Sequence, residues 1–534
     1  MSDRLNEAEG VIRREIGDIE HCNSQESAVW IINTHTLSRL CHAEGRWGEA
    51  EELFTQVVKT SKKVFGETHP HTLTGISNLA STYRDQGRWK ETEELEAHVM
   101  ETRKRVLGEE HPSTLISMDN LASMIRERGR GKEAEGLFMQ AMETRRRIFG
   151  EEHRWTLISM GNLALTYKHQ GRWQEAEKLE VQAMETGMRV LGKEHPDLLT
   201  CVNNLALTYN NYGRWKEAEK LLAELLGTRK MLFGEKHPST LTSMNNLALI
   251  YSNRGRWKEA EEMRVQVMEI RTKLFGEEHP DTLTSMGNLA STFLKQGRWK
   301  DAEGLFAQVM QTRKRVLGDE HPNTLTSMGN LASAYRDQGL WKEAEKLEDQ
   351  AMETRMRVFG KEHPDTLACM SNLAITFWNQ GRWKEAEELG EQVVEIRKRV
   401  LGEEHPDTLV SMGNLASTFW KQRRWKEAEK LEVQVMEIST RVLGKEHPDT
   451  LVSMGNLAST YRNQRRWKEA EKLEVQVMET SIRTLGAGHP STVTSIHNLA
   501  STYRNQGRWN EAKELLVKVT EAMKRRPGRS IAQR

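Results

Sequence analysis

Eleven histidines recur at a constant interval of 42 residues, and imidazole side chains could bind a metal ion or act as general bases. Proline follows every one of them except His153, which is followed by Arg154. Each repeated unit supplies only one imidazole, so stacked units would set the rings in a row along one edge and would not gather them on one ion. We therefore predict a structural role at the start of a helix, and no metal site. The histidines are His69, His111, His153, His195, His237, His279, His321, His363, His405, His447 and His489.

Other signatures of catalysis are missing from the sequence. The segment "GRGKE" at 129–133 has the wrong spacing for a phosphate-binding loop and lacks Ser or Thr after Lys132. The motifs HExxH, GxSxG and CxxC do not occur. Most carboxylates recur in columns beside Lys or Arg, as on solvated helix faces. We expect neither an enzyme nor a cofactor.

Composition narrows the classes of partner. The 534 residues include 78 basic and 77 acidic side chains, a balance that argues against nucleic acid as the main partner. Four cysteines (Cys22, Cys41, Cys201 and Cys369) match neither a disulfide framework nor a zinc knuckle. The sequence has no apolar leader and no run of about 18 apolar residues, so we predict a cytoplasmic protein without membrane insertion.

Each 42-residue unit reads as two helices. In the unit that starts at Pro280, apolar residues from Leu283 to Phe293 are spaced by three and four, which predicts one amphipathic helix. Pro280 suits the first helical turn, and Gly297 suits a left-handed cap at the end. A second helix is predicted from Trp299 to a closing Gly318. No segment alternates with the period of a strand.

Neither helix can bury its apolar stripe alone, so neighbouring units must stack. We predict an all-α solenoid of about twelve units at 28–526, preceded at 1–27 by the second helix of a partial unit and a linker, and followed at 527–534 by a disordered basic tail. The Trp column, from Trp47 to Trp509, is expected to anchor neighbouring units. One column of the second helix holds Phe in some units but Glu96, Glu180, Arg264 or Glu432 in others, and we expect that position to drift to the surface.

The pattern "NLA..Y..QG.W.EAE" resembles tetratricopeptide repeats, although the standard unit has about 34 residues. The longer second helix, followed by "VLGEEHPDTL", is similar to the repeats of kinesin light chains and of fungal receptors that carry a nucleotide-binding NB-ARC module. No heptad coiled coil precedes the repeats, unlike in a kinesin light chain. The resemblance implies a right-handed superhelix whose first helices line a concave groove that binds proteins or peptides. The alternative is the ligand-sensing arm of an NB-ARC or NACHT-type receptor whose NTPase part is absent from this chain.

The resemblance places two sets of residues in that groove. One is an invariant Asn, whose amide either bonds a neighbouring helix or holds the main chain of a bound peptide. The other is a variable position six residues later, joined by Lys421 in the next column, which would give selectivity. The Asn residues are Asn78, Asn120, Asn162, Asn204, Asn246, Asn288, Asn330, Asn372, Asn414, Asn456 and Asn498. The selected variable residues are Arg84, Arg126, Lys168, Arg336, Trp378, Trp420, Arg462 and Arg504.

Overall fold

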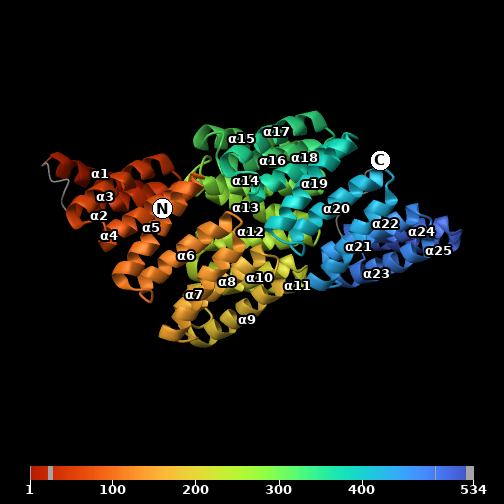
Figure 1. The fold of residues 1–534 in the computed structure, drawn as a ribbon, viewed down its shortest axis with the longest axis horizontal. Coiled ribbons are helices and arrows are strands. Elements are labelled where there is room, and N and C mark those ends of the chain that lie inside the picture. Colours follow the sequence, from red (N-terminus) through yellow and green to blue (C-terminus); the bar gives the residue numbers. More distant parts are fainter. Residues whose placement is uncertain (1, 22–27, 488, 525–534) are drawn as a thin grey trace.

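The computed structural model describes residues 2–21, 28–487 and 489–524, and every regular element in these ranges is a helix (Figure 1). A lone helix α1 (Ser2–His21) precedes twelve helical pairs. The first helices of the pairs are α2 (Ala28–Ala43), α4 (Pro70–Asp85), α6 (Pro112–Glu127), α8 (Arg154–His169), α10 (Pro196–Asn211), α12 (Pro238–Asn253), α14 (Pro280–Gln296), α16 (Pro322–Asp337), α18 (Pro364–Asn379), α20 (Pro406–Lys421), α22 (Pro448–Asn463) and α24 (Pro490–Asn505). The second helices are α3 (Trp47–Phe65), α5 (Trp89–Leu107), α7 (Gly131–Phe149), α9 (Trp173–Val190), α11 (Trp215–Phe233), α13 (Trp257–Phe275), α15 (Trp299–Leu317), α17 (Trp341–Phe359), α19 (Trp383–Val400), α21 (Trp425–Val442), α23 (Trp467–Leu485) and α25 (Trp509–Lys524).

The all-α solenoid of twelve pairs is thus confirmed. Residues 22–27, which belong to the predicted partial unit and linker at 1–27, and the predicted tail at 527–534 lie outside the described residues. No described helix combines the length and the apolar character that crossing a bilayer requires.

The histidine column caps the first helices. The Nδ1 atom of His279 accepts a hydrogen bond from the backbone N–H of Asp281, at 3.1 Å, and Pro280 occupies the first helical position. This cap satisfies one of the backbone donors that a helix start leaves free. The same cap forms at all eleven histidines, which confirms their structural role.

An arginine before the second helix ties each described pair to the preceding helix, except in the unit where Leu340 stands at this position. Arg298 donates to Asp301 in its own helix and to Glu261 in the preceding second helix, both at 2.7 Å, and its guanidinium lies 4.0 Å from the Phe293 ring centroid. The same link occurs at the N-terminal end, where Arg46 donates to Glu9 at 2.9 Å. Helix α1 therefore takes the place of a second helix before α2.

First helices form the inner wall of the superhelix. Successive first helices contact each other directly, as α8 contacts α10 and α14 contacts α16. Among the described residues, no two successive second helices come comparably close. The array therefore curves toward its first helices.

Consecutive turns of the superhelix touch, although no pattern in the sequence predicts this contact. The Nε2 atom of His321 donates to the backbone carbonyl of Asp85 at 2.7 Å, and the His321 ring stacks on Trp47 at a centroid distance of 5.4 Å. Beside them, a Cβ atom added to Gly87 would lie 2.6 Å from Cδ of Pro322. The contact joins residues 236 positions apart and brings the start of α16 to the end of α4. Glycine suits this position for two reasons: its φ is 79°, and another side chain would collide with the next turn.

The expectation that the Trp column anchors neighbouring units holds only in part, because Trp215 packs on the core shared by α10 to α13 but other members of the column are largely exposed. Trp299 is 45% exposed and Trp509 is 62% exposed. Each ring starts a second helix at the rim of the array, where the next turn covers it only in the N-terminal part, as at Trp47. Alanines such as Ala290 and Ala302, both fully buried, form the close contacts between helices.

Two arginines replace the cap glycine where no turn covers it. Arg423 and Arg465 keep the left-handed conformation, each with φ of 64°, and are the two non-glycine residues with positive φ among those described. We expect Arg423→Gly and Arg465→Gly each to raise the free energy of unfolding by about 1 kcal/mol, because glycine adopts this conformation without strain. Thermal unfolding of each variant measures the gain, and an unchanged midpoint would contradict the prediction.

Candidate functional site

The Asn column lies midway along the first helices, on the inner wall. Three of its members bond the preceding first helix: the Nδ2 atom of Asn78 lies 2.7 Å from Nε2 of His35, and Asn120 and Asn246 donate to Ser77 and Asn203 at 3.2 and 2.8 Å. Within the described ranges, the other eight side-chain amides form no hydrogen bond to the protein. The stacking interpretation therefore holds for three amides, and binding of a peptide main chain by the other eight stays a prediction.

The second-helix position that was expected to drift to the surface is buried, so that expectation was wrong. Glu96, Glu180 and Glu432 are 5%, 1% and 4% exposed, and Arg264 is 6% exposed. The position points between two first helices, where a charged head group must find a partner. A first-helix cation twelve residues earlier provides it in several units.

The cations that pair with the buried Glu residues belong to the variable column that was predicted to line the groove. Lys168 donates to Glu180 at 2.8 Å, Arg336 donates to Glu348, and Arg462 lies 3.5 Å from Glu474. Burial raises the pKa of Glu348, and the charge of Arg336 opposes this shift. The three cations thus compensate buried carboxylates, and their contact with a ligand stays a prediction. The spacing of twelve residues between cation and Glu was the signal that could have revealed the pairs.

The remaining arginines of the column differ in exposure. Burial lowers the pKa of Arg126, whose Nε and Nη1 atoms are buried without a hydrogen-bond partner, and its guanidinium lies 5.5 Å from the Phe138 ring. Arg84 lies 3.5 Å from Asp85, and Arg504 is exposed beside Trp509. The column therefore offers no continuous basic stripe.

Trp378, Trp420 and Lys421 of two neighbouring first helices, α18 and α20, lie side by side, and their contact with a ligand stays a prediction. The Lys421 ammonium lies 4.7 Å from the Trp378 ring centroid and 5.5 Å from that of Trp420. The Trp378 indole donates to the carbonyl of Ser417 at 3.4 Å. Trp420 is partly buried, because its ring also packs on the core between α20 and α21.

A cavity of about 230 Å³ adjoins Trp378. Ile375, Gly390 and Leu415 are among the residues that line it. Gly390 occupies the column that holds Phe138 or a buried Glu in other units, so the missing side chain opens the space. This is the chemistry of a pocket for an apolar side chain.

Glu432 lacks the cation that its equivalents have, because Trp420 stands at the partner position. Burial raises the pKa of Glu432 to about 7, and the charge of Glu429 adds to the shift. An acid whose pKa rises on folding loses stability as the pH increases from its unfolded pKa through its folded pKa. We expect Glu432→Gln to remove a loss of about 2–3 kcal/mol between about pH 5 and pH 8. Thermal midpoints across this range measure it, and Glu437→Gln on the exposed face of the same helix should leave the pH dependence unchanged.

Comparison with family models assigns the repeat. A tetratricopeptide repeat model matches residues 30–91, 114–186, 169–230, 198–263, 239–315, 288–356, 328–399, 377–438, 421–480 and 456–525, and a second tetratricopeptide repeat model matches 72–113. The chain belongs to the tetratricopeptide repeat family. The resemblance inferred from the sequence is confirmed, and a tetratricopeptide repeat array is a scaffold for protein interaction.

Solved structures of other tetratricopeptide-like proteins are similar to parts of the chain. A Podosopora anserina protein described as a kinesin light chain with nearly identical repeats is 36% identical over 38% of this chain and 97% of its own, with a TM-score of 0.33, and a form of it with one substitution has a TM-score of 0.34. BtubC (BKLC) from P. vanneervenii is 22% identical over 43% of this chain and 92% of its own, with a TM-score of 0.36. No curated protein matches the chain in a search of sequences.

Proposed function

We propose that the inner wall of the array binds extended segments of partner proteins. The Asn amides would grip the main chain of the segment, and the variable column would select its side chains. Helix-lined concave surfaces of solenoids suit extended ligands because neighbouring units repeat the same contacts. A cytoplasmic location remains a prediction.

The observation that carries the proposal is the aromatic cluster at Trp378, Trp420 and Lys421 with the cavity beside it. Trp is among the residue types enriched at binding hot spots, and an indole beside an open apolar cavity can contact a ligand side chain. The unbonded Asn414 amide lies next to the same cavity. Main-chain and side-chain recognition are therefore available at one place.

Replacement of Trp378 tests the proposal. Proteins captured from a cell extract by the immobilised full chain would be identified by mass spectrometry, and the affinity of a captured partner would then be measured. We expect Trp378→Ala to weaken binding by about 30-fold, as the loss of a hot-spot residue does. Trp299→Ala is the matched control, since Trp299 is 45% exposed at the outer rim. Equal affinity of the Trp378→Ala variant and the native chain would refute a binding role for the cluster.

A further inference from the structure

Seven second helices carry a buried arginine at one position near their C-terminal end. Arg313 donates to the carbonyl of Asn323 at 3.2 Å, to the hydroxyl of Ser327 at 2.9 Å and to Thr284 at 3.2 Å. The guanidinium therefore lies between two successive first helices, α14 and α16. The seven residues are Arg103, Arg145, Arg229, Arg271, Arg313, Arg355 and Arg397.

Two units in the N-terminal half lack this arginine, and the residues that would surround its side chain are also replaced there. Gly187 stands at the arginine position, and Cys201 replaces the serine that would accept its hydrogen bond. A Cβ atom on Gly187 would lie 3.3 Å from Cδ1 of Leu198, so Leu198 closes the space. In the first pair Ser61 likewise stands at the arginine position, and Gly75 replaces the acceptor serine.

Two late units lack the arginine but keep its acceptors. Ser439 and Ser481 stand at the arginine position, while the acceptor serines Ser453 and Ser495 remain. Their hydroxyls turn back to the carbonyls of Thr450 and Thr492, each at 2.8 Å. In occupied units the hydroxyl bonds the carbonyl four residues earlier, as in Ser327 to Asn323 at 2.9 Å. Ser453 and Ser495 therefore lack the arginine that donates to the equivalent serine in other units.

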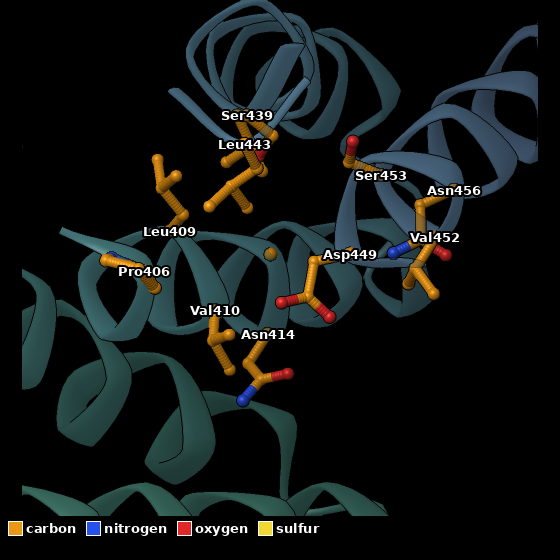
Figure 2. A pocket seen from close by; sticks show the side chains of 12 residues that line it. Pro406, Leu409, Val410, Asn414, Ser439, Leu443, Asp449, Val452, Ser453 and Asn456 are labelled. Carbon is orange, nitrogen blue, oxygen red and sulfur yellow. The ribbon is translucent and has the colours of Figure 1, made fainter. Parts of the chain in front are cut away.

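Each of these units contains an open slot. The slot at Ser439 has a volume of about 120 Å³ and the slot at Ser481 about 380 Å³. Figure 2 shows the first slot, with Ser439 from α21, Val410 from α20 and Asp449 from α22 around a common space. The slots are one repeat apart and lie between α20, α22 and α24, on the wall that carries the Asn column.

Acidic groups line both slots. Asp449 in the first slot is the equivalent of Asp407, which faces the buried Arg397. Glu474 in the second slot is 2% exposed, and neither of its carboxylate oxygens forms a hydrogen bond; Arg462, at 3.5 Å, is its cationic neighbour. A buried carboxylate without hydrogen bonds is costly unless a donor arrives.

The slot walls also fit the stem of a long side chain. Val410 and Val452 line the slots and are 50% and 60% exposed. Most other units carry Thr here, as at Thr284, which bonds the internal arginine. Exposed valines offer apolar contact to the methylene groups of arginine.

We propose that the slots at Ser439 and Ser481 receive arginine side chains from the bound segment of a partner protein, in the place that the chain's own arginines fill in neighbouring units. The inference rests on the proposed function of the inner wall. Arginine fits better than lysine because its planar guanidinium donates to a carbonyl, a hydroxyl and a carboxylate at once.

The experiment uses a variant in which the protein's own side chains occupy both slots. The variant Ser439→Arg with Ser481→Arg restores the side chain that seven other units already accommodate, so we expect it to fold. N-acetyl-arginine amide would be titrated into the full chain with labelled valine methyl groups. We expect saturable shifts at Val410 and Val452 in the native chain, none at the outer Val106, and no shifts in the double variant. The lysine and leucine amides should bind at least several-fold more weakly.

Three outcomes would overturn the inference: no shift with the arginine amide, equal binding of the leucine amide, or unchanged binding by the filled variant. A partner segment should also lose at least about tenfold in affinity for the filled variant. If Trp378→Ala abolishes capture of partners while the filled variant retains it, the proposed function stands and the arginine slots are refuted. If the filled variant loses capture while Trp378→Ala retains it, the slots stand and the role proposed for the Trp378 cluster is refuted; if neither variant alters capture, the arginine slots are refuted as well.

Discussion

Replacement of Glu348 by glutamine should lower the stability of the surrounding units by about 3–5 kcal/mol. The Glu348 side chain is fully buried and accepts hydrogen bonds from Arg336 and from the hydroxyl of Thr376. Glutamine keeps the size but removes the negative charge, so the Arg336 guanidinium, 12% exposed, would lose its counter-ion. Removal of one partner of a buried ion pair costs more than the pair contributes.

Hydrogen exchange in α16, α17 and α18 is the appropriate measurement, because long repeat arrays need not unfold in one step. We expect exchange in these helices to accelerate while exchange in α4 and α5 stays unchanged. Glu432→Gln at the equivalent position is the matched control and should stabilise, since Glu432 has no cation to leave behind. Equal effects of the two substitutions would show that the ion pair does not decide the stability of this column.

Alanine at Gly87 should destabilise the array far more than alanine at Gly297. The two glycines have φ angles of 79° and 78°, so both substitutions carry a conformational cost of about 1–2 kcal/mol. Only at Gly87 does a neighbouring turn stand in the way, with Pro322 Cδ 2.6 Å from the added Cβ; nothing lies within 4 Å at Gly297. The collision adds about 1–3 kcal/mol unless the turns separate.

Thermal unfolding and X-ray scattering together distinguish these results. We expect Gly87→Ala to lower the midpoint beyond Gly297→Ala, or to increase the radius of gyration if the contact between turns opens. Identical midpoints and radii for the two variants would mean that the contact between turns does not persist in solution.

The fold of each unit could be predicted because its causes are local. Pro280 and His279 lie within one helical turn of the helix start that they fix, and Gly297 directly ends the helix. The apolar spacing from Leu283 to Phe293 identifies the buried face without knowledge of the neighbouring units. Because the period is constant, the structure predicted for one unit applies to all twelve.

Contacts between distant residues could not be predicted in the same way. The approach of His321 to Asp85 depends on the small rotation between successive units, summed over more than five of them, and no local pattern encodes that sum. Glu180 appeared to be a surface residue because its partner, Lys168, lies on the preceding helix. The arginine slots could be recognised only from the structure, because the structure shows that seven other units bury an arginine at the same position.

Site-specific photo-cross-linking tests most directly whether the inner wall binds partner proteins. A photoreactive residue would replace Val452 on first helix α22 or Val106 on second helix α5, which are 60% and 49% exposed. We expect a captured partner to cross-link through position 452 and not through position 106. Cross-linking through position 106 alone would place the binding surface on the outer wall and contradict binding at the inner wall.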